Sequence, residues 1–235
     1  MKLRKIKFNE ILAIIATLLL IAGHIIFKPE WYVVFPLYIS MIVKFLNSNV
    51  SRYAFLLGGI NCIFHGIASI ALTLYSTAAC AILLLLPLQI ITFINWSKHT
   101  RDGVTEIKRF SNKGRVLLFG VLIAGWVVLY FIFSSLNSSY IFLDNTATVL
   151  SVAAIVLSLL RYSEGFLLSL AEVVVNVILF MQVTIKDPNE PAAPIWLVFY
   201  IYSVICVIIG FVKMNKRSTE TMKKALENTE QEHAK

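Results

Sequence analysis

The sequence has few charged residues. Only 14% of its 235 residues are Asp, Glu, Lys or Arg, and the 13 acidic residues are outnumbered by 21 basic ones. A soluble domain usually carries about a quarter charged residues. The net charge is +8, but so few charged residues leave no soluble domain that could form a basic groove. We therefore expect no nucleic-acid partner.

Cysteine and the common catalytic motifs are also scarce or missing. Cys62, Cys80 and Cys206 are dispersed within apolar runs, and their spacing predicts neither a disulfide nor a metal site. The sequence contains no Walker loop, no His-Glu-x-x-His, no nucleophile elbow and no Cys-x-x-Cys. We therefore expect no cofactor, no ATP hydrolysis and no enzymatic activity.

The chain instead has long apolar runs, with 58% hydrophobic residues and a mean hydropathy of +0.79. Helices of about 17 to 25 apolar residues span a bilayer, and backbone polar groups in lipid must pair internally. The sequence therefore predicts an all-α integral membrane protein. Eight spans fit, roughly 10–27, 31–47, 53–75, 77–96, 116–135, 142–160, 165–185 and 194–212. The short second span and the close third and fourth spans leave a count of seven open.

Basic residues separate to one side of these spans. With eight spans, the side opposite the termini keeps only Lys28 and Lys186. The positive-inside rule then places both termini in the cytoplasm of a multi-pass protein of the cell membrane. Trp31 and Trp196 are predicted as anchors at the outer interface, and Trp96 at the inner one.

An acid interrupts the apolar run at 161–182. Glu172 and Asn176 are four residues apart, so they share one helix face. A charged side chain at mid-membrane costs roughly 2.5 to 3.5 kcal/mol, so such groups usually face a protein interior or a wet cavity. Ionised, Glu172 would attract a cationic ring, whereas protonated it would hydrogen-bond a ribose hydroxyl. A purely structural acid is the alternative.

A second polar pair lies at the same depth in the first half of the chain. Arg52-Tyr53 and Phe55-Leu56-Leu57 align with Arg161-Tyr162 and Phe166-Leu167-Leu168 if two residues are inserted. Asn61 then coincides with Glu172, and His65 with Asn176. This predicts two parallel three-helix repeats around a linker helix, with a substrate site between them. The predicted divisions are a cytoplasmic tail with an additional helix (1–30), the first repeat (31–97), a basic cytoplasmic loop with the linker helix (98–140), the second repeat (141–213) and a polar cytoplasmic tail (214–235).

Over roughly 31–217 the chain resembles the PnuC-type family of nicotinamide riboside and vitamin transporters. The resemblance rests on three segments, NCIFHGIASIALTLY (61–75), NWSKHT (95–100) and LRYSE (160–164). It implies a SWEET-like 3+1+3 helix bundle. The family's Trp-x-x-x-Asn pattern falls here on Ser169 to Val173, with the polar groups displaced to Glu172 and Asn176.

The candidate site residues are polar or aromatic side chains from both halves. Aromatic rings are included because they can stack on a flat vitamin ring, and the polar residues are alternatively helix-packing contacts. The predicted substrate-binding set is Asn61, His65, Gln89, Trp96, Glu172, Asn176 and Tyr200.

The expected function is facilitated diffusion of a vitamin-type nucleoside such as nicotinamide riboside across the bilayer. The resemblance implies a homotrimer, and a cytoplasmic kinase that traps the substrate by phosphorylation. Thiamine or a (deoxy)ribonucleoside is an alternative substrate, and a non-transporting membrane scaffold is an alternative class.

Overall fold

The computed structural model describes residues 8–101, 104–105, 108–135 and 140–233, so the basic residues before Phe8 lie outside the described part. Almost all of the described chain is helical. The elements are α1 (Phe8–Phe27), α2 (Trp31–Ser48), α3 (Tyr53–Ala71), α4 (Tyr75–Cys80), the π-helical segment η1 (Ala81–Leu85), α5 (Leu86–Lys98), β1 (Thr100–Arg101), β2 (Val104–Thr105), α6 (Asn112–Ser134), α7 (Ile141–Leu159), α8 (Glu164–Lys186) and α9 (Ala193–His233).

Eight spans are long and apolar enough to cross a membrane within the described residues. One of them is built from α4, η1 and α5 together, and another is the part of α9 up to Lys216. The all-α, eight-span prediction is confirmed. The third span is shorter than predicted, because α3 ends at Ala71 and the turn to α4 comes at Thr73.

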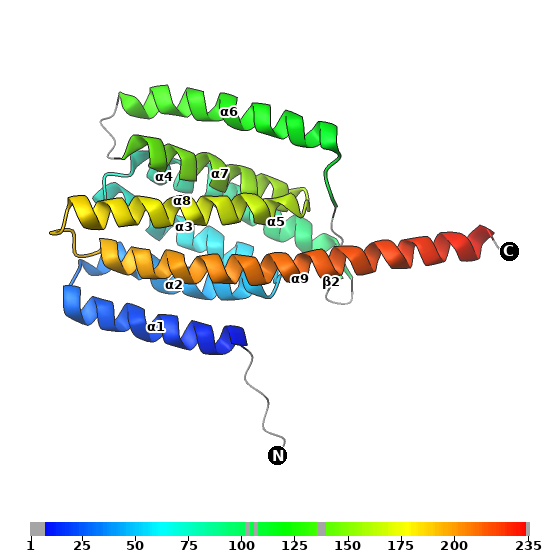
Figure 1. Cartoon of the computed structure of the whole chain (residues 1–235), viewed down its shortest axis with the longest axis horizontal. Coiled ribbons are helices and arrows are strands. Elements are labelled where there is room, and N and C mark those ends of the chain that lie inside the picture. Colours follow the sequence, from blue (N-terminus) through cyan, green and yellow to red (C-terminus); the bar gives the residue numbers. More distant parts are fainter. Residues whose placement is uncertain (1–7, 102–103, 106–107, 136–139, 234–235) are drawn as a thin grey trace, which may run out of the picture.

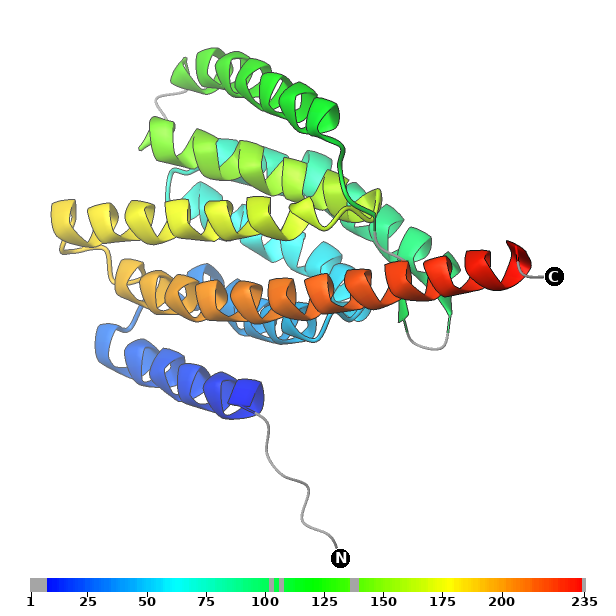
Figure 2. The ribbon, with the colours of Figure 1, turned by 45° about the vertical axis from the view of Figure 1, so that its right-hand side comes forward.

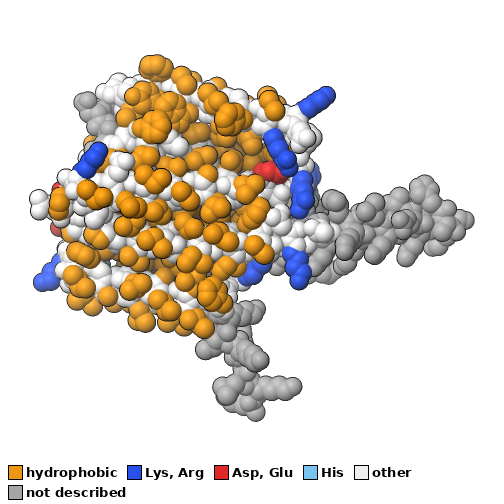
Figure 3. All heavy atoms as spheres, viewed as in Figure 1, with side chains coloured by type: hydrophobic (Ala, Val, Ile, Leu, Met, Phe, Trp, Pro, Cys, Tyr) orange, Lys and Arg blue, Asp and Glu red, His pale blue; other side chains and the backbone are white. Residues whose placement is uncertain are grey.

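The outside of the bundle is apolar. Figure 3 shows hydrophobic side chains covering the visible face between its two ends, where Lys and Arg lie. Apolar exposure is clearest on α6, where Phe133 is the one buried residue and Val116 is 75% exposed. Exposing so much apolar surface to water is unfavourable in free energy, whereas contact with hydrocarbon is not. The surface therefore belongs in a bilayer.

The spans run side by side, as Figures 1 and 2 show. The start of α1 and the long extension of α9 lie at the same end of the bundle, which we call the terminal end; the opposite end is the far end. Helices α2, α3 and α5 pack together, as do α7, α8 and α9. These two groups meet through α2 with α9 and through α5 with α7. Helix α1 lies outside them against α9 and α2, and α6 lies against α7.

The turns from α2 to α3 and from α7 to α8 have the same geometry. Each contains a residue with positive φ, Val50 (54°) and Arg161 (64°), which are 111 residues apart. The bond from Ser51 N to Leu46 O (3.1 Å) recurs at the same interval from Tyr162 N to Leu157 O (2.8 Å). Phe55 thus still matches Phe166, as predicted. The pairing of Arg52-Tyr53 with Arg161-Tyr162 is wrong, because the turns match without an insertion.

The fourth span changes helical type in its middle. The π-helical η1 separates α4 from α5, and Pro87 follows at the start of α5. The proline ring cannot continue an α-helical hydrogen-bond ladder through the preceding turn. The fourth span accommodates Pro87 with one π turn, which packs against α3.

Two of the three predicted tryptophan anchors are wrong. Trp31 is 65% exposed on the outside of the bundle, whereas Trp96 and Trp196 are 1% and 2% exposed. Hydropathy predicts how deep a residue lies in a span but not which face of the helix carries it. Both rings are part of the protein interior.

Candidate functional site

A cavity of about 190 Å³ lies between the two helix groups. Its walls come from α2, α3, α4, η1 and α5 on one side and from α7, α8 and α9 on the other, and none of the lining residues belongs to α1 or α6. Six of the seven residues predicted from the sequence line it. They are Asn61, His65, Gln89, Glu172, Asn176 and Tyr200.

Glu172 and Asn176 form one hydrogen-bonded unit on α8. The Asn176 amide Nδ2 donates to Glu172 Oε1 at 2.7 Å and to the Glu172 carbonyl oxygen at 3.0 Å. Helical spacing of four residues places the amide over the carboxyl group. Asn176 is buried, and Glu172 keeps part of its surface in the cavity. The carboxyl group is therefore held in one place with one oxygen bonded.

The opposite wall presents amide oxygens without partners. Asn61 Nδ2 donates to Ser40 Oγ at 2.6 Å, which fixes the amide. The Asn61 Oδ1 and Gln89 Oε1 atoms are buried and have no hydrogen-bond partner among the described residues. The Gln89 amide packs about 3.0 to 3.1 Å from where a Cβ on Gly58 would stand. A buried polar atom without a partner costs about 1 to 3 kcal/mol, so these oxygens are suited to a ligand or water that donates hydrogen bonds.

Lys44 also lines this cavity. It belongs to α2, and the sequence did not predict it as a site residue. The cavity thus contains a base as well as an acid. This arrangement reduces the attraction for a purely cationic ligand relative to an isolated carboxylate.

Aromatic rings close one wall. The His65 ring stacks on Trp196 with centroids 5.2 Å apart, and Trp196 stacks on Tyr200 at 5.9 Å. Phe180 stacks behind them, 5.2 Å from Trp196 and 5.4 Å from Tyr200. His65 and Tyr200 line the cavity, as does Phe199. The stack thus brings aromatic rings to the wall of the cavity that Glu172 also lines.

Trp96 lies outside the cavity lining. Its Nε1 donates to the Ser158 carbonyl oxygen at 2.6 Å, and its ring meets Phe55 edge-on at 4.8 Å. Ser158 and Phe55 both line the cavity. The structure therefore places Trp96 one layer behind the wall, where it ties α5 to the end of α7.

A buried carboxylate joins the helix groups toward the far end. Asp144 at the start of α7 is fully buried and accepts hydrogen bonds from Ser76 N (3.2 Å), Thr77 N (3.3 Å) and Thr77 Oγ1 (2.5 Å). Thr77 Oγ1 is also 3.2 Å from Thr148 Oγ1, and both threonines line the cavity. The carboxylate satisfies the free N–H groups that begin α4.

The lining repeats at the interval seen in the turns. Lining residues separated by 111 positions include Ser40 with Ser151, Gly58 with Ser169, Asn61 with Glu172 and His65 with Asn176. Sequence reasoning found the last two pairs and missed the serines. Applying the Phe55-to-Phe166 interval to the preceding helices would have found Ser40 and Ser151.

Eight apolar spans, with a polar-lined cavity between the two helix groups, define a multi-pass membrane protein. The sequence matches the nicotinamide mononucleotide transporter family over residues 30–216, and the chain belongs to that family. This confirms the resemblance seen in the sequence and agrees with a transporter rather than an enzyme.

Two known proteins are similar to the chain. A Neisseria mucosa protein described as "Nicotinamide riboside transporter PnuC" is 25% identical over 177 residues, which are 72% of this chain and 65% of that protein. The chain thus matches just under two thirds of that relative's length. A crystal structure described as that of "the Vitamin B3 transporter PnuC" has a TM-score of 0.77 and 18% identity, with 92% of this chain and 94% of that one covered. The fold is therefore of this type.

Proposed function

We propose that the protein carries a vitamin-type nucleoside such as nicotinamide riboside across the membrane by facilitated diffusion. The observation that carries the proposal is the cavity between the two helix groups, where two buried amide oxygens have no partner within the described part of the chain and Glu172 also lines the wall. Transporters built from two repeats bind substrate near the midplane between them and alternate access around that site.

The walls suit the parts of a nucleoside. A flat heterocycle can lie against the rings of His65 and Tyr200, and ribose hydroxyls can donate to Asn61 Oδ1 and Gln89 Oε1. Glu172 either accepts from a hydroxyl or offsets a positive ring. A non-transporting scaffold would have no use for these unpartnered oxygens.

A second substrate class is a neutral (deoxy)ribonucleoside, and the observation that favours it is Lys44. This lysine lines the cavity with Glu172, so the pair offers less net attraction to a cation such as thiamine or nicotinamide riboside. Both classes use the same rings and amides.

We further propose two parallel three-helix repeats, with α2 to α5 (31–97) as the first, α6 as linker and α7 to α9 (141–213) as the second. The matching turns at Val50 and Arg161 support this. We place both termini in the cytoplasm, because basic residues gather at the terminal end and the positive-inside rule then applies. A homotrimer and a cytoplasmic kinase that traps the substrate complete the proposal and rest on the family resemblance.

Uptake into proteoliposomes tests this function. Purified protein should take up labelled nicotinamide riboside or a neutral nucleoside, and uptake should persist when ionophores collapse the proton and sodium gradients. Uptake that stops with the gradients would contradict facilitated diffusion. Vesicles that take up none of these compounds would contradict the transport proposal as a whole.

A further inference from the structure

A second cavity, of about 660 Å³, lies at the terminal end and outside the substrate site. It is an open pocket between the start of α6, the start of α8 and the part of α9 where that helix leaves the membrane span. The lining residues are Arg109, Arg115, Leu118, Ser163, Glu164, Leu167, Leu168, Phe211 and Asn215. None of them lines the cavity around Glu172.

The lining changes from polar to apolar along the helices. Arg115 and Glu164 belong to the first turns of α6 and α8, and Asn215 lies near the membrane end of α9. Leu118 and Leu168 follow about one turn further into the span, as does Phe211 from the other direction. A ligand that fills this space needs a polar head at the membrane surface and apolar chains below it.

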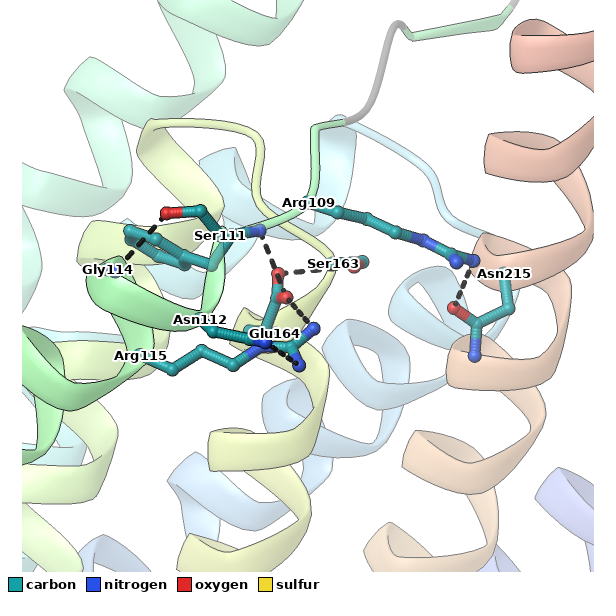
Figure 4. Close-up of polar contacts among 9 residues, drawn as sticks. Arg109, Ser111, Asn112, Gly114, Arg115, Ser163, Glu164 and Asn215 are labelled. Carbon is teal, nitrogen blue, oxygen red and sulfur yellow. Dashed lines mark hydrogen bonds and ion pairs between the residues drawn. The ribbon is translucent and has the colours of Figure 1, made fainter.

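Two guanidinium groups are fixed around the polar part (Figure 4). Arg109 reaches across to Asn215 Oδ1 at 3.4 Å, and Arg115 contacts Glu164 Oε1 at 3.2 Å. The Glu164 carboxylate also accepts from Phe110 N (3.1 Å) and Ser163 Oγ (3.3 Å), so it is held against the protein. The Arg115 side chain remains 55% exposed. Two arginines against one acid leave the site positive, and guanidinium groups match phosphate oxygens.

We propose that this cavity binds an anionic phospholipid of the leaflet at the terminal end. The phosphate group lies between Arg109 and Arg115, and the acyl chains lie along Leu118, Leu168 and Phe211 between α6 and α8. Among the spans, α6 contacts the bundle mainly through α7, and its start leaves space beside α8 and α9 that a lipid fills. A free phosphate ion could bind the same two arginines, but it would make no use of the apolar walls.

Native mass spectrometry of the purified full chain tests the site. Phosphatidylglycerol should remain bound at lower concentration than phosphatidylcholine. Each of Arg109→Gln and Arg115→Gln should weaken phosphatidylglycerol binding about five-fold, the effect of one basic residue near an anionic lipid. Arg109→Gln removes one contact to Asn215 and leaves the ion pair of Arg115 with Glu164 intact. It therefore still tests lipid binding if Arg115→Gln impairs folding. Arg52→Gln with Lys113→Gln removes two charges outside the cavity and should have no effect.

Leu118→Trp separates a lipid from a free anion. It keeps every charge but fills the apolar part, so phosphatidylglycerol binding should fall while the charge-state distribution of the protein stays that of the folded wild type. The proposal is overturned if the two lipids bind equally or if the control pair weakens binding as much as the site arginines. It is also overturned if Leu118→Trp leaves phosphatidylglycerol binding unchanged and inorganic phosphate displaces the bound molecule. None of these outcomes depends on the substrate of the central cavity.

Discussion

At the scale of single residues, the charge of the central cavity depends on Lys44 as well as Glu172. We predict that Lys44→Gln strengthens the binding of cationic ligands such as thiamine about five-fold, because it removes a repulsion on the order of 1 kcal/mol. A neutral nucleoside should bind with little change. Titration calorimetry of both ligands measures this, with Lys98→Gln, exposed at the end of α5, as the matched control. Equal gains for both ligands, or for the control, would contradict the electrostatic reason.

Glu172, which the sequence singled out, and Lys44, which it did not, differ in a physical way. An acid deep in an apolar run is costly, so Glu172 stands out without a structure. Lys44 lies near the end of a short span, where lysines usually reach the interface. Only the packing of α2 against α9 shows that its side chain lines the cavity.

At the scale of elements, the contact between α3 and the fourth span depends on Gly66. A Cβ there would stand 2.7 Å from Ile82 Cγ1 on η1, so Gly66→Ala should cost about 1 to 3 kcal/mol of stability by overpacking. Gly125→Ala on α6 is the control, because no atom of the described residues lies within 4 Å of its Cβ position. Thermal unfolding in detergent should show a lower midpoint for Gly66→Ala alone. Equal midpoints for the two variants would contradict the described packing.

The junction between α4 and α7 depends on Asp144. Asp144→Ala leaves Ser76 N and Thr77 N without their acceptor, and hydrogen bonds to charged groups contribute about 1.5 to 3 kcal/mol each. We predict a loss of about 3 kcal/mol, read as a lower thermal midpoint. Asp187→Ala, which removes an exposed carboxylate after α8, should leave the midpoint unchanged. An Asp144→Ala protein as stable as the wild type would show that this carboxylate does not hold the halves together.

The sequence predicted where the helices are, but not what type of helix each one is or how the helices are joined. Helix existence followed from apolar length, because lipid leaves the backbone few alternatives. The type of helix did not, since a π turn satisfies the backbone hydrogen bonds as an α turn does. Asp144 was not singled out, because the groups that satisfy it lie 67 and 68 residues away.

At the scale of the whole molecule, the orientation in the membrane is open to a direct test. In a background with Cys62, Cys80 and Cys206 replaced by serine, an impermeant maleimide added to intact cells should label Asp187→Cys. Lys216→Cys, at the terminal end, should be labelled only after lysis. The reverse pattern would place the termini outside the cell.

The arrangement of the whole was predicted as far as internal repetition allows. The interval between Phe55 and Phe166 gave the two polar pairs, and the structure brings them to one cavity. A single sequence does not show which helices of one group touch the other. It also does not show that Trp96 lies behind the wall while Trp196 stacks on His65, because both depend on packing between helices.

Calorimetric titration of the purified protein with nicotinamide riboside tests whether the cavity around Glu172 is the substrate site. Glu172→Gln should weaken binding at least ten-fold, about 1.4 kcal/mol, because the carboxylate that offsets the positive ring is lost. Glu30→Gln, exposed before α2, should bind as the wild type does. A Glu172→Gln protein that binds nicotinamide riboside as tightly as the wild type would contradict the account.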